Sequence, residues 1–145
     1  MIDLKTTPYA ALVLRAAMGI MFIAHGLLKF VVFTPAGTAS YFASLGLPAP
    51  LAYAVIAAEL LGGIALIVGV QVRLVSLGLV PVLLGAAVLG HGSNGWMFAA
   101  EGGGWEFPAF WAAALVVQSL IGAGAFASQP AFRVRAAGRM PRQAV

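Results

Sequence analysis

Four ionisable side chains interrupt two apolar stretches of the sequence. Arg15, His25 and Lys29 lie in the first stretch, and Glu59 lies near the middle of the second. If these stretches cross a membrane, each central charge costs about 2.5–3.5 kcal/mol on insertion scales, so such residues usually face a bundle interior or a cavity. These four residues are therefore the first candidates for ligand binding or proton chemistry.

The first stretch places its polar residues on one helical face. At about 100° per residue, Arg15, Phe22, His25 and Lys29 project to the same side. We expect Arg15 to form an ion pair with Glu59 at a similar depth. Two interpretations stay open: the pair fixes how two helices dock, or Glu59 titrates and moves protons or holds a polar headgroup.

A second polar cluster is expected at one end of the helices. His25, Lys29 and His91 should meet there, with Asn94 and Glu106 nearby. Structural interpretations also remain, because Lys29 can extend to lipid headgroups and His91 can simply cap its helix. The spacing of these residues matches no metal motif, so we expect no metal site.

The composition indicates what positions these residues. Of 145 residues, 62% are hydrophobic and 8% are charged, against about 45–50% and 25% in soluble domains. This excludes a soluble enzyme domain and a disordered chain. We predict an all-α integral membrane four-helix bundle, a single domain over 1–145, with spans at about 9–30, 50–70, 74–90 and 107–126. Gln118 should hydrogen-bond between these helices.

The charges predict the orientation. The first apolar stretch contains Arg15 and lacks a small-residue cleavage site, so we expect a retained span rather than a cleaved signal. Lys5, Arg73 and the arginines of the basic tail at 127–145 fall on one side. With four spans, both termini are expected in the cytoplasm of a bacterial inner membrane.

Two connecting segments carry further signals. Thr34-Pro35 is a helix start and Gly46-Leu47-Pro48 is a stop, so a short interfacial helix is expected between them, with Tyr41, Phe42 and Leu45 as its apolar stripe. The glycine-rich loop at 91–106 is interpreted either as a mobile lid or as a flexible connector. The tryptophans near it fit an aromatic belt at the outer interface: Trp96, Trp105 and Trp111.

Some cofactors are excluded by the sequence. There is no cysteine, which removes disulfides, Fe–S clusters, thiolate metal sites and c-type haem attachment. Phosphate-binding, dinucleotide-binding and serine-nucleophile motifs are also missing. A redox role must therefore use a borrowed cofactor or a partner.

Taken together, the motifs resemble those of the DoxX family of small bacterial membrane proteins, over about 12–127. The matching positions are Arg15, Gly19, Phe22, His25-Gly26, Lys29-Phe30, the run 42–50, the run 59–63, Gly69, Arg73 and His91-Gly92. The resemblance implies a four-helix membrane bundle. It also implies a quinone-linked oxidoreductase role, because relatives include the membrane subunit of a thiosulfate:quinone oxidoreductase. By resemblance, the polar interior comprises Arg15, His25, Lys29, Glu59 and His91.

The leading hypothesis is a quinone-interacting subunit that depends on a membrane or peripheral redox partner. A quinone headgroup needs hydrogen-bond donors and a proton route, with aromatic walls around it. The expected catalytic residues are Glu59 and Arg15, and the expected ligand-binding residues are His25, Lys29, His91, Phe22 and Trp105. Trp111 would add a further apolar wall.

Two other functions remain open. A scaffold or assembly factor would bind partner membrane proteins, or a second copy of the chain, through glycine-rich helices. A small-molecule carrier has less support, because no inverted repeat is visible. Nucleic-acid binding is not expected, since a basic juxtamembrane tail explains the net charge of +4.

Overall fold

The structure, a computed structural model, describes residues 3–128 and consists of helices and connecting loops over that range. The predicted all-α fold is therefore confirmed. The basic tail expected at 127–145 lies outside the described residues except for its first two positions. The elements are α1 (Thr7–Leu27), η1 (Leu28–Val32), α2 (Pro35–Ser44), α3 (Pro50–Val68), α4 (Val72–Gly85), η2 (Ala86–Gly90), η3 (Gly92–Asn94) and α5 (Glu106–Ile121).

Three helical stretches are long and apolar enough to cross a membrane. They cover 7–32, 50–68 and 72–90, and the first and third each end in a five-residue π-helical turn, η1 and η2. The fourth, α5, has 16 residues, or roughly 24 Å of helix against a hydrocarbon layer of about 30 Å. It ends at Ile121 rather than near 126, because Gly122 adopts a φ of 86° that does not continue a helix.

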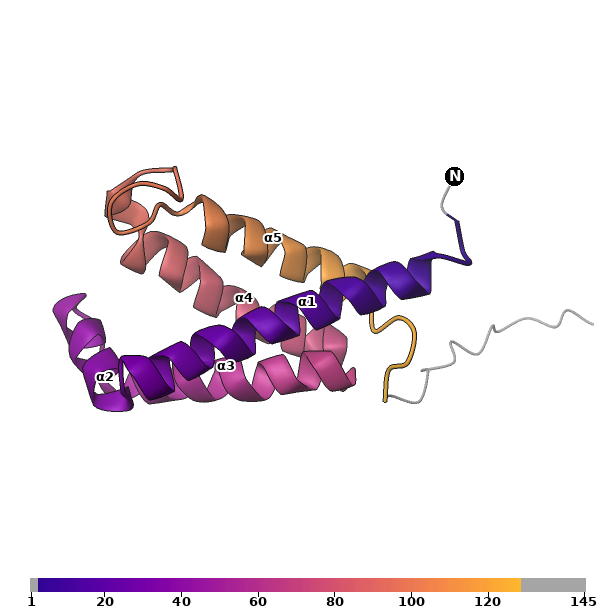
Figure 1. The fold of residues 1–145 in the computed structure, drawn as a ribbon, viewed down its shortest axis with the longest axis horizontal. Coiled ribbons are helices and arrows are strands. Elements are labelled where there is room, and N and C mark those ends of the chain that lie inside the picture. Colours follow the sequence, from indigo (N-terminus) through magenta and orange to yellow (C-terminus); the bar gives the residue numbers. More distant parts are fainter. Residues whose placement is uncertain (1–2, 129–145) are drawn as a thin grey trace, which may run out of the picture.

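The four long helices pack as two pairs. Figure 1 shows α1 lying along α3 and α4 lying along α5, with α2 at one end. We call this the α2 end. The start of α1 and the segment 122–128, which follows α5, lie together at the opposite end.

Glycine brings α1 and α3 into backbone contact. A Cβ built on Gly19 would lie 2.7 Å from the Gly63 carbonyl oxygen, and one built on Gly63 would lie 2.8 Å from the Gly19 oxygen. Neither position therefore accepts a side chain without separating the helices. This contact sets how closely the face with Lys29 approaches the face with Glu59.

Apolar side chains fill the interior and also cover the exterior. Met18, Phe22, Leu66 and Leu115 are buried at the centre. The outer faces carry equally apolar residues with high exposure, such as Leu120 at 70%. An exterior of this kind suits contact with lipid acyl chains rather than water.

The expected short helix between the first two spans is present as α2. The Thr34 side chain accepts a hydrogen bond from the Gly37 amide at 3.1 Å, and Pro35 follows at the first helical position. The helix stops before Gly46, whose φ is 76°. Cap and stop were therefore both predicted from residue type, and α2 packs against η1 and α3.

Candidate functional site

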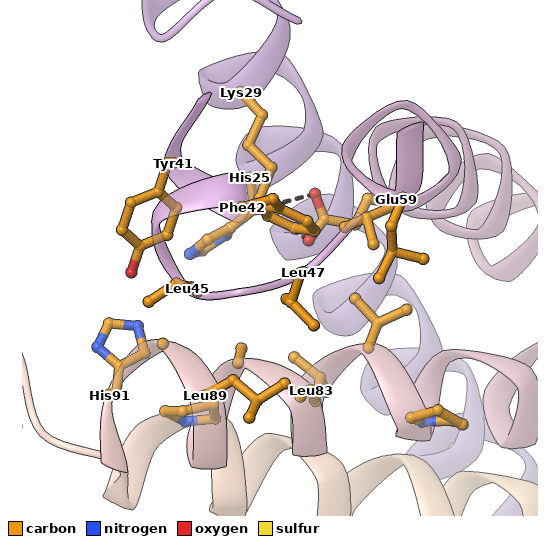
Figure 2. Close-up of a pocket in the computed structure, with 18 of the residues that line it drawn as sticks. His25, Lys29, Tyr41, Phe42, Leu45, Leu47, Glu59, Leu83, Leu89 and His91 are labelled. Atoms are coloured by element: carbon orange, nitrogen blue, oxygen red, sulfur yellow. Dashed lines mark hydrogen bonds and ion pairs between the residues drawn. The ribbon is translucent and has the colours of Figure 1, made fainter. Parts of the chain in front are cut away.

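A cavity of about 480 Å³ lies at the α2 end, among all the long helices. Its lining is mainly apolar, and its ionisable members are His25, Lys29, Glu59 and His91. In Figure 2, His25, Lys29 and Glu59 lie along one wall and His91 lies across from them, at the end of η2. The apolar lining comprises Phe42, Leu45, Leu47, Leu51, Val55, Pro81, Val82, Leu83, Gly85, Ala86, Leu89, Gly90, Phe107, Pro108 and Trp111, with Tyr41 beside them.

Lys29 and Glu59 form an ion pair at this wall. The Lys29 Nζ donates to both carboxylate oxygens of Glu59, each at 2.9 Å. The side chains are 22% and 5% exposed, respectively. Lys29 comes from the π-helical turn η1, and Glu59 from the middle of α3, so the pair joins the two helices at the cavity.

The expected Arg15–Glu59 pair is not formed, and this corrects the sequence interpretation. Glu59 is level with Gly26, because a Cβ on Gly26 would lie 3.3 Å from the Glu59 Cβ. Arg15 is eleven residues earlier on α1, which places it roughly 16 Å away along the helix axis. Lys29 is the cation at the depth of Glu59.

Arg15 instead binds backbone carbonyl groups at the opposite end, and it is 1% exposed. Its Nε donates to Ala123 O at 2.8 Å and its Nη2 to Ala125 O at 2.9 Å. Its Nη1 donates to Leu66 O at 2.8 Å and to Ile67 O. The last carbonyls of a helix lack intrahelical partners and carry partial negative charge, so a guanidinium satisfies the end of α3 and the segment after α5 together.

Both histidines at the cavity use the same ring nitrogen to bind the backbone. His25 Nδ1 lies 2.9 Å from Met21 O, and His91 Nδ1 lies 3.0 Å from Gly103 O and 3.2 Å from Gly102 O. A carbonyl only accepts, so Nδ1 carries the proton in each ring. In the neutral imidazole, Nε2 is then a hydrogen-bond acceptor.

His91 and its neighbours also fold the glycine-rich loop. The Asn94 side chain donates to Gly102 O and Gly103 O, both at 3.0 Å, and Glu106 accepts from the Phe98 amide at 2.7 Å. Asn94 and Glu106 were expected beside His25 and Lys29, but they hold loop backbone instead. Whether the loop acts as a lid stays a prediction.

The aromatic residues are placed differently from the expectation. Phe22 is fully buried behind Trp111, with ring centroids 4.3 Å apart, and it is not among the lining residues. Trp105 lines a separate open groove with Trp96 and Phe98. A helical projection cannot predict where Phe22 and Trp105 lie relative to the cavity, because both positions depend on how neighbouring segments pack against them.

Trp111 lines the cavity, and it carries a buried donor that the sequence did not reveal. It was expected in an interfacial belt or as an apolar wall, and its 4% exposure and its place in the lining agree with the second of these. Its Nε1 has no hydrogen-bond partner among residues 3–128. A buried donor without a partner is uncommon in proteins and needs a specific explanation.

Two further expectations concern helix packing. Gln118 was expected to bond between helices, but its Nε2 donates to Gly122 O at 2.6 Å, just beyond the end of its own helix. Most of the glycines proposed as partner-binding surfaces are used inside the chain, since added Cβ atoms would meet neighbouring helices. Those are Gly19, Gly26, Gly62 and Gly63, whereas Gly78 and Gly85 face open space.

Within the described part of the chain, no three histidine or acidic residues gather as metal ligands would. The polar groups at the cavity can instead hold an uncharged ring through hydrogen bonds. Lys29 supplies donors, and the two Nε2 atoms supply acceptors.

Comparison with known proteins gives the family. "Putative oxidoreductase CatD" of Bacillus subtilis is 38% identical over 84 residues, which cover 58% of this chain and 61% of that protein. "Inner membrane protein YphA" of Escherichia coli is 32% identical over 125 residues, 81% of this chain and 86% of that protein. No solved structure matches. The DoxX family model matches residues 10–92, over half of the sequence, and the chain therefore belongs to the DoxX family.

Proposed function

We propose that the cavity at the α2 end binds a quinone-type ring, and that the protein is the membrane subunit of a quinone-linked oxidoreductase. The observation that carries the proposal is the cavity itself, where an ion pair and two imidazoles meet apolar walls. Its volume of about 480 Å³ falls within the range of about 300–1,000 Å³ that is usual for small-molecule sites.

The residues present fit such a ring. A quinone has two carbonyl oxygens that accept hydrogen bonds, and an ammonium has three donors. Lys29 uses donors on the two Glu59 oxygens, which leaves one N–H for a ligand. Phe42 and Phe107 supply ring faces among the lining residues.

A bound quinone would supply two-electron, two-proton redox chemistry, with electrons from a partner protein or an external reductant. The contribution of the chain is to orient the ring and to handle protons. Glu59 can hold a proton at either carboxylate oxygen, and Lys29 lies 2.9 Å from both. The name of the Bacillus subtilis relative supports the oxidoreductase class.

The walls between α3 and α4 support a ligand that arrives from the lipid. Figure 1 shows these helices close to each other at the turn 69–71 and apart towards the α2 end. The lining residues there are apolar, and Leu51 and Leu89 are 41% and 48% exposed. A ring with an apolar tail can lie in the cavity while its tail remains among acyl chains.

Filling the cavity tests the proposal. Gly85 lines it, and a Cβ there meets nothing within 4 Å, so Gly85→Phe should occupy the space without moving the backbone. The protein is purified from its native membrane in mild detergent, and the extracted lipids are measured by an oxidised-minus-reduced ultraviolet spectrum. We expect near-stoichiometric quinone in the unmodified protein and at least a tenfold reduction in Gly85→Phe.

Gly78→Phe is the matched control. Gly78 is on the same helix, also faces open space, and is not among the lining residues. This variant should retain its quinone. Background quinone in the unmodified protein, or equal loss in both variants, contradicts the proposal.

We further propose that both termini face the cytoplasm and that the α2 end faces outwards. Lys5 comes just before α1 and Arg73 is in the first turn of α4, both of these helices start at the opposite end (Figure 1), and basic loops favour the cytoplasm. Since the sequence has no cysteine, Lys5→Cys and Ser44→Cys give single labelling sites at the two ends. In intact cells an impermeant maleimide should label Ser44→Cys and not Lys5→Cys. The reverse pattern would invert the orientation.

A further inference from the structure

We propose that α2 is a hinged lid over the cavity, and that Thr38 couples the closed position of this lid to Lys29. The inference rests on the proposed function only in taking the same cavity as the ligand site. It goes further by naming the element that separates the cavity from the aqueous phase at that end, and the residue that links this element to the ion pair.

The first observation is the position of α2 beside the cavity. Tyr41 and Phe42 of α2 line the cavity, and so does Leu45, which directly follows the helix. Figure 2 shows the Tyr41 ring reaching towards the end of η2, where His91 lies. A Cβ built on Gly90 would lie 3.7 Å from the Tyr41 hydroxyl oxygen. Tyr41 therefore connects α2 to the opposite wall of the cavity.

The second observation is how little of α2 is buried. The helix packs mainly against η1 and α3, and of its ten residues only Thr38 and Ala39 are buried. Segments with few buried contacts open at a fraction of the free energy of global unfolding. We therefore expect α2 to leave the cavity while the four long helices stay packed.

The third observation is the backbone at the two joints of α2. Thr34 precedes the helix with φ 62° and ψ 152°, and Gly46 follows it with φ 76°. This conformation is strained at a β-branched residue such as Thr34, and such strain persists only where surrounding contacts impose it. A Cβ on Gly46 would meet nothing within 4 Å, so no neighbouring group crowds this joint. The closed position is thus strained at one joint and unhindered at the other.

The fourth observation is the hydrogen bond between α2 and the turn that carries Lys29. Thr38 is 4% exposed, and its Oγ1 donates to Lys29 O at 3.2 Å and to Thr34 O at 2.9 Å. The Lys29 carbonyl is near the end of η1, where carbonyls lack partners within the helix. The Lys29 ammonium binds Glu59. Opening of α2 removes the Thr38 bond from η1 and so loosens the ion pair, and by linkage a broken ion pair favours opening.

The lid controls the access of water to the ion pair. When α2 is closed, water is excluded and the electrostatic attraction between Lys29 and Glu59 is strong. When α2 is open, the pair can exchange protons with the aqueous phase at that end. Proton exchange at the cavity should therefore require movement of α2.

A thiol placed inside the cavity measures opening without any quinone. The chain has no cysteine, and Val55, which lines the cavity, is close to cysteine in size, so Val55→Cys supplies a single reporter. In lipid nanodiscs, a negatively charged methanethiosulfonate reacts with this thiol only when water-soluble molecules reach the cavity. We expect a reaction at least about tenfold slower than that of Ser44→Cys, at an exposed position of α2, because opening must come first.

Substitutions of Thr38 in the reporter protein test the role of its hydroxyl. Thr38→Val keeps the shape and should raise the reaction rate about fivefold, the effect of one net hydrogen bond, whereas Thr38→Ser should restore the slow rate. Ser40→Ala is the matched control, because Ser40 also donates to the carbonyl four residues earlier, Ala36 O at 3.1 Å, but not to η1. An unchanged rate in Thr38→Val, or an equal increase in Ser40→Ala, overturns the proposal.

A double-mutant cycle in the reporter protein tests the coupling to the ion pair. The double variant Lys29→Met/Glu59→Gln should itself speed the reaction, because η1 is no longer anchored to α3 by the pair. Thr38→Val should then have a smaller effect than it has beside the intact pair, since coupled contacts are non-additive. An equal effect of Thr38→Val in both backgrounds overturns the coupling.

Tyr41→Ala covers the case in which Thr38→Val does not fold. Tyr41 is 49% exposed, so its truncation should be tolerated, and loss of its contact with η2 should raise the reporter rate. A reporter that reacts as fast as Ser44→Cys, or an unchanged rate in Tyr41→Ala, overturns the lid. Because the test uses no quinone, a functioning lid without bound quinone would contradict the proposed function alone. Bound quinone with one constant reaction rate across these variants would contradict this inference alone.

Discussion

Replacing Arg15 with methionine should destabilise the folded protein by at least about 3 kcal/mol, the cost of leaving several buried carbonyl groups without their charged donor. The guanidinium donates to four backbone carbonyls, at Leu66, Ile67, Ala123 and Ala125. Methionine preserves the apolar length of the side chain but satisfies none of them. Unfolding in mixed detergent micelles, followed by circular dichroism, measures the loss.

The position of the damage should be specific. Hydrogen exchange should rise first in segment 122–128, because Arg15 supplies hydrogen bonds to two of its carbonyls, while exchange around Glu59 changes little. Lys5→Met, at an exposed lysine just before the start of α1, should leave both stability and exchange unchanged. An Arg15→Met protein with normal stability would show that the observed bonds contribute little.

The second large effect concerns the ion pair at the cavity. Lys29→Met leaves the Glu59 carboxylate, 5% exposed, without its cation, and Glu59→Gln leaves the Lys29 ammonium without its anion. Breaking a buried pair on one side costs about 3–5 kcal/mol, whereas removing both members is much less costly. We therefore expect each single variant to be strongly destabilised and the double variant to recover most of the stability.

Function should separate from stability in this series. If the pair serves only to dock α1 on α3, the double variant should hold quinone as the unmodified protein does. If Lys29 orients the ring, the double variant should fold, but its bound quinone should fall at least tenfold. Glu101→Gln, in the exposed loop, is the control. Additive destabilisation in the double variant would contradict the coupling itself.

The helices could be predicted from the sequence because hydrophobic runs and local caps determine them. The start of α2 at Thr34-Pro35 follows from a side chain and a ring within one turn of the chain. The end of α5 was placed too late, because the stretch after Ile121 is as apolar as the helix before it. Hydropathy alone cannot distinguish a helix from the bends and turns that follow it there.

The candidate site could be predicted from the sequence only in part. The helical projection put Arg15, His25 and Lys29 on one face, and the structure agrees that His25 and Lys29 share a cavity wall. The predicted partner of Glu59 was wrong, because the relative depth of two helices depends on the glycine contact between them. The buried donor of Trp111 was hidden, because indole rings at interfaces and in cavities have the same sequence signature.

The short fourth helix has a consequence for the surrounding bilayer. With roughly 24 Å of helix against about 30 Å of hydrocarbon, α5 produces a hydrophobic mismatch. Non-helical backbone next to its ends is tolerated at membrane depth only where protein groups satisfy it. Arg15 does this for segment 122–128, and His91 and Asn94 do it for the loop carbonyls at the other end. The protein should therefore prefer thin bilayers, or thin the lipid beside α5.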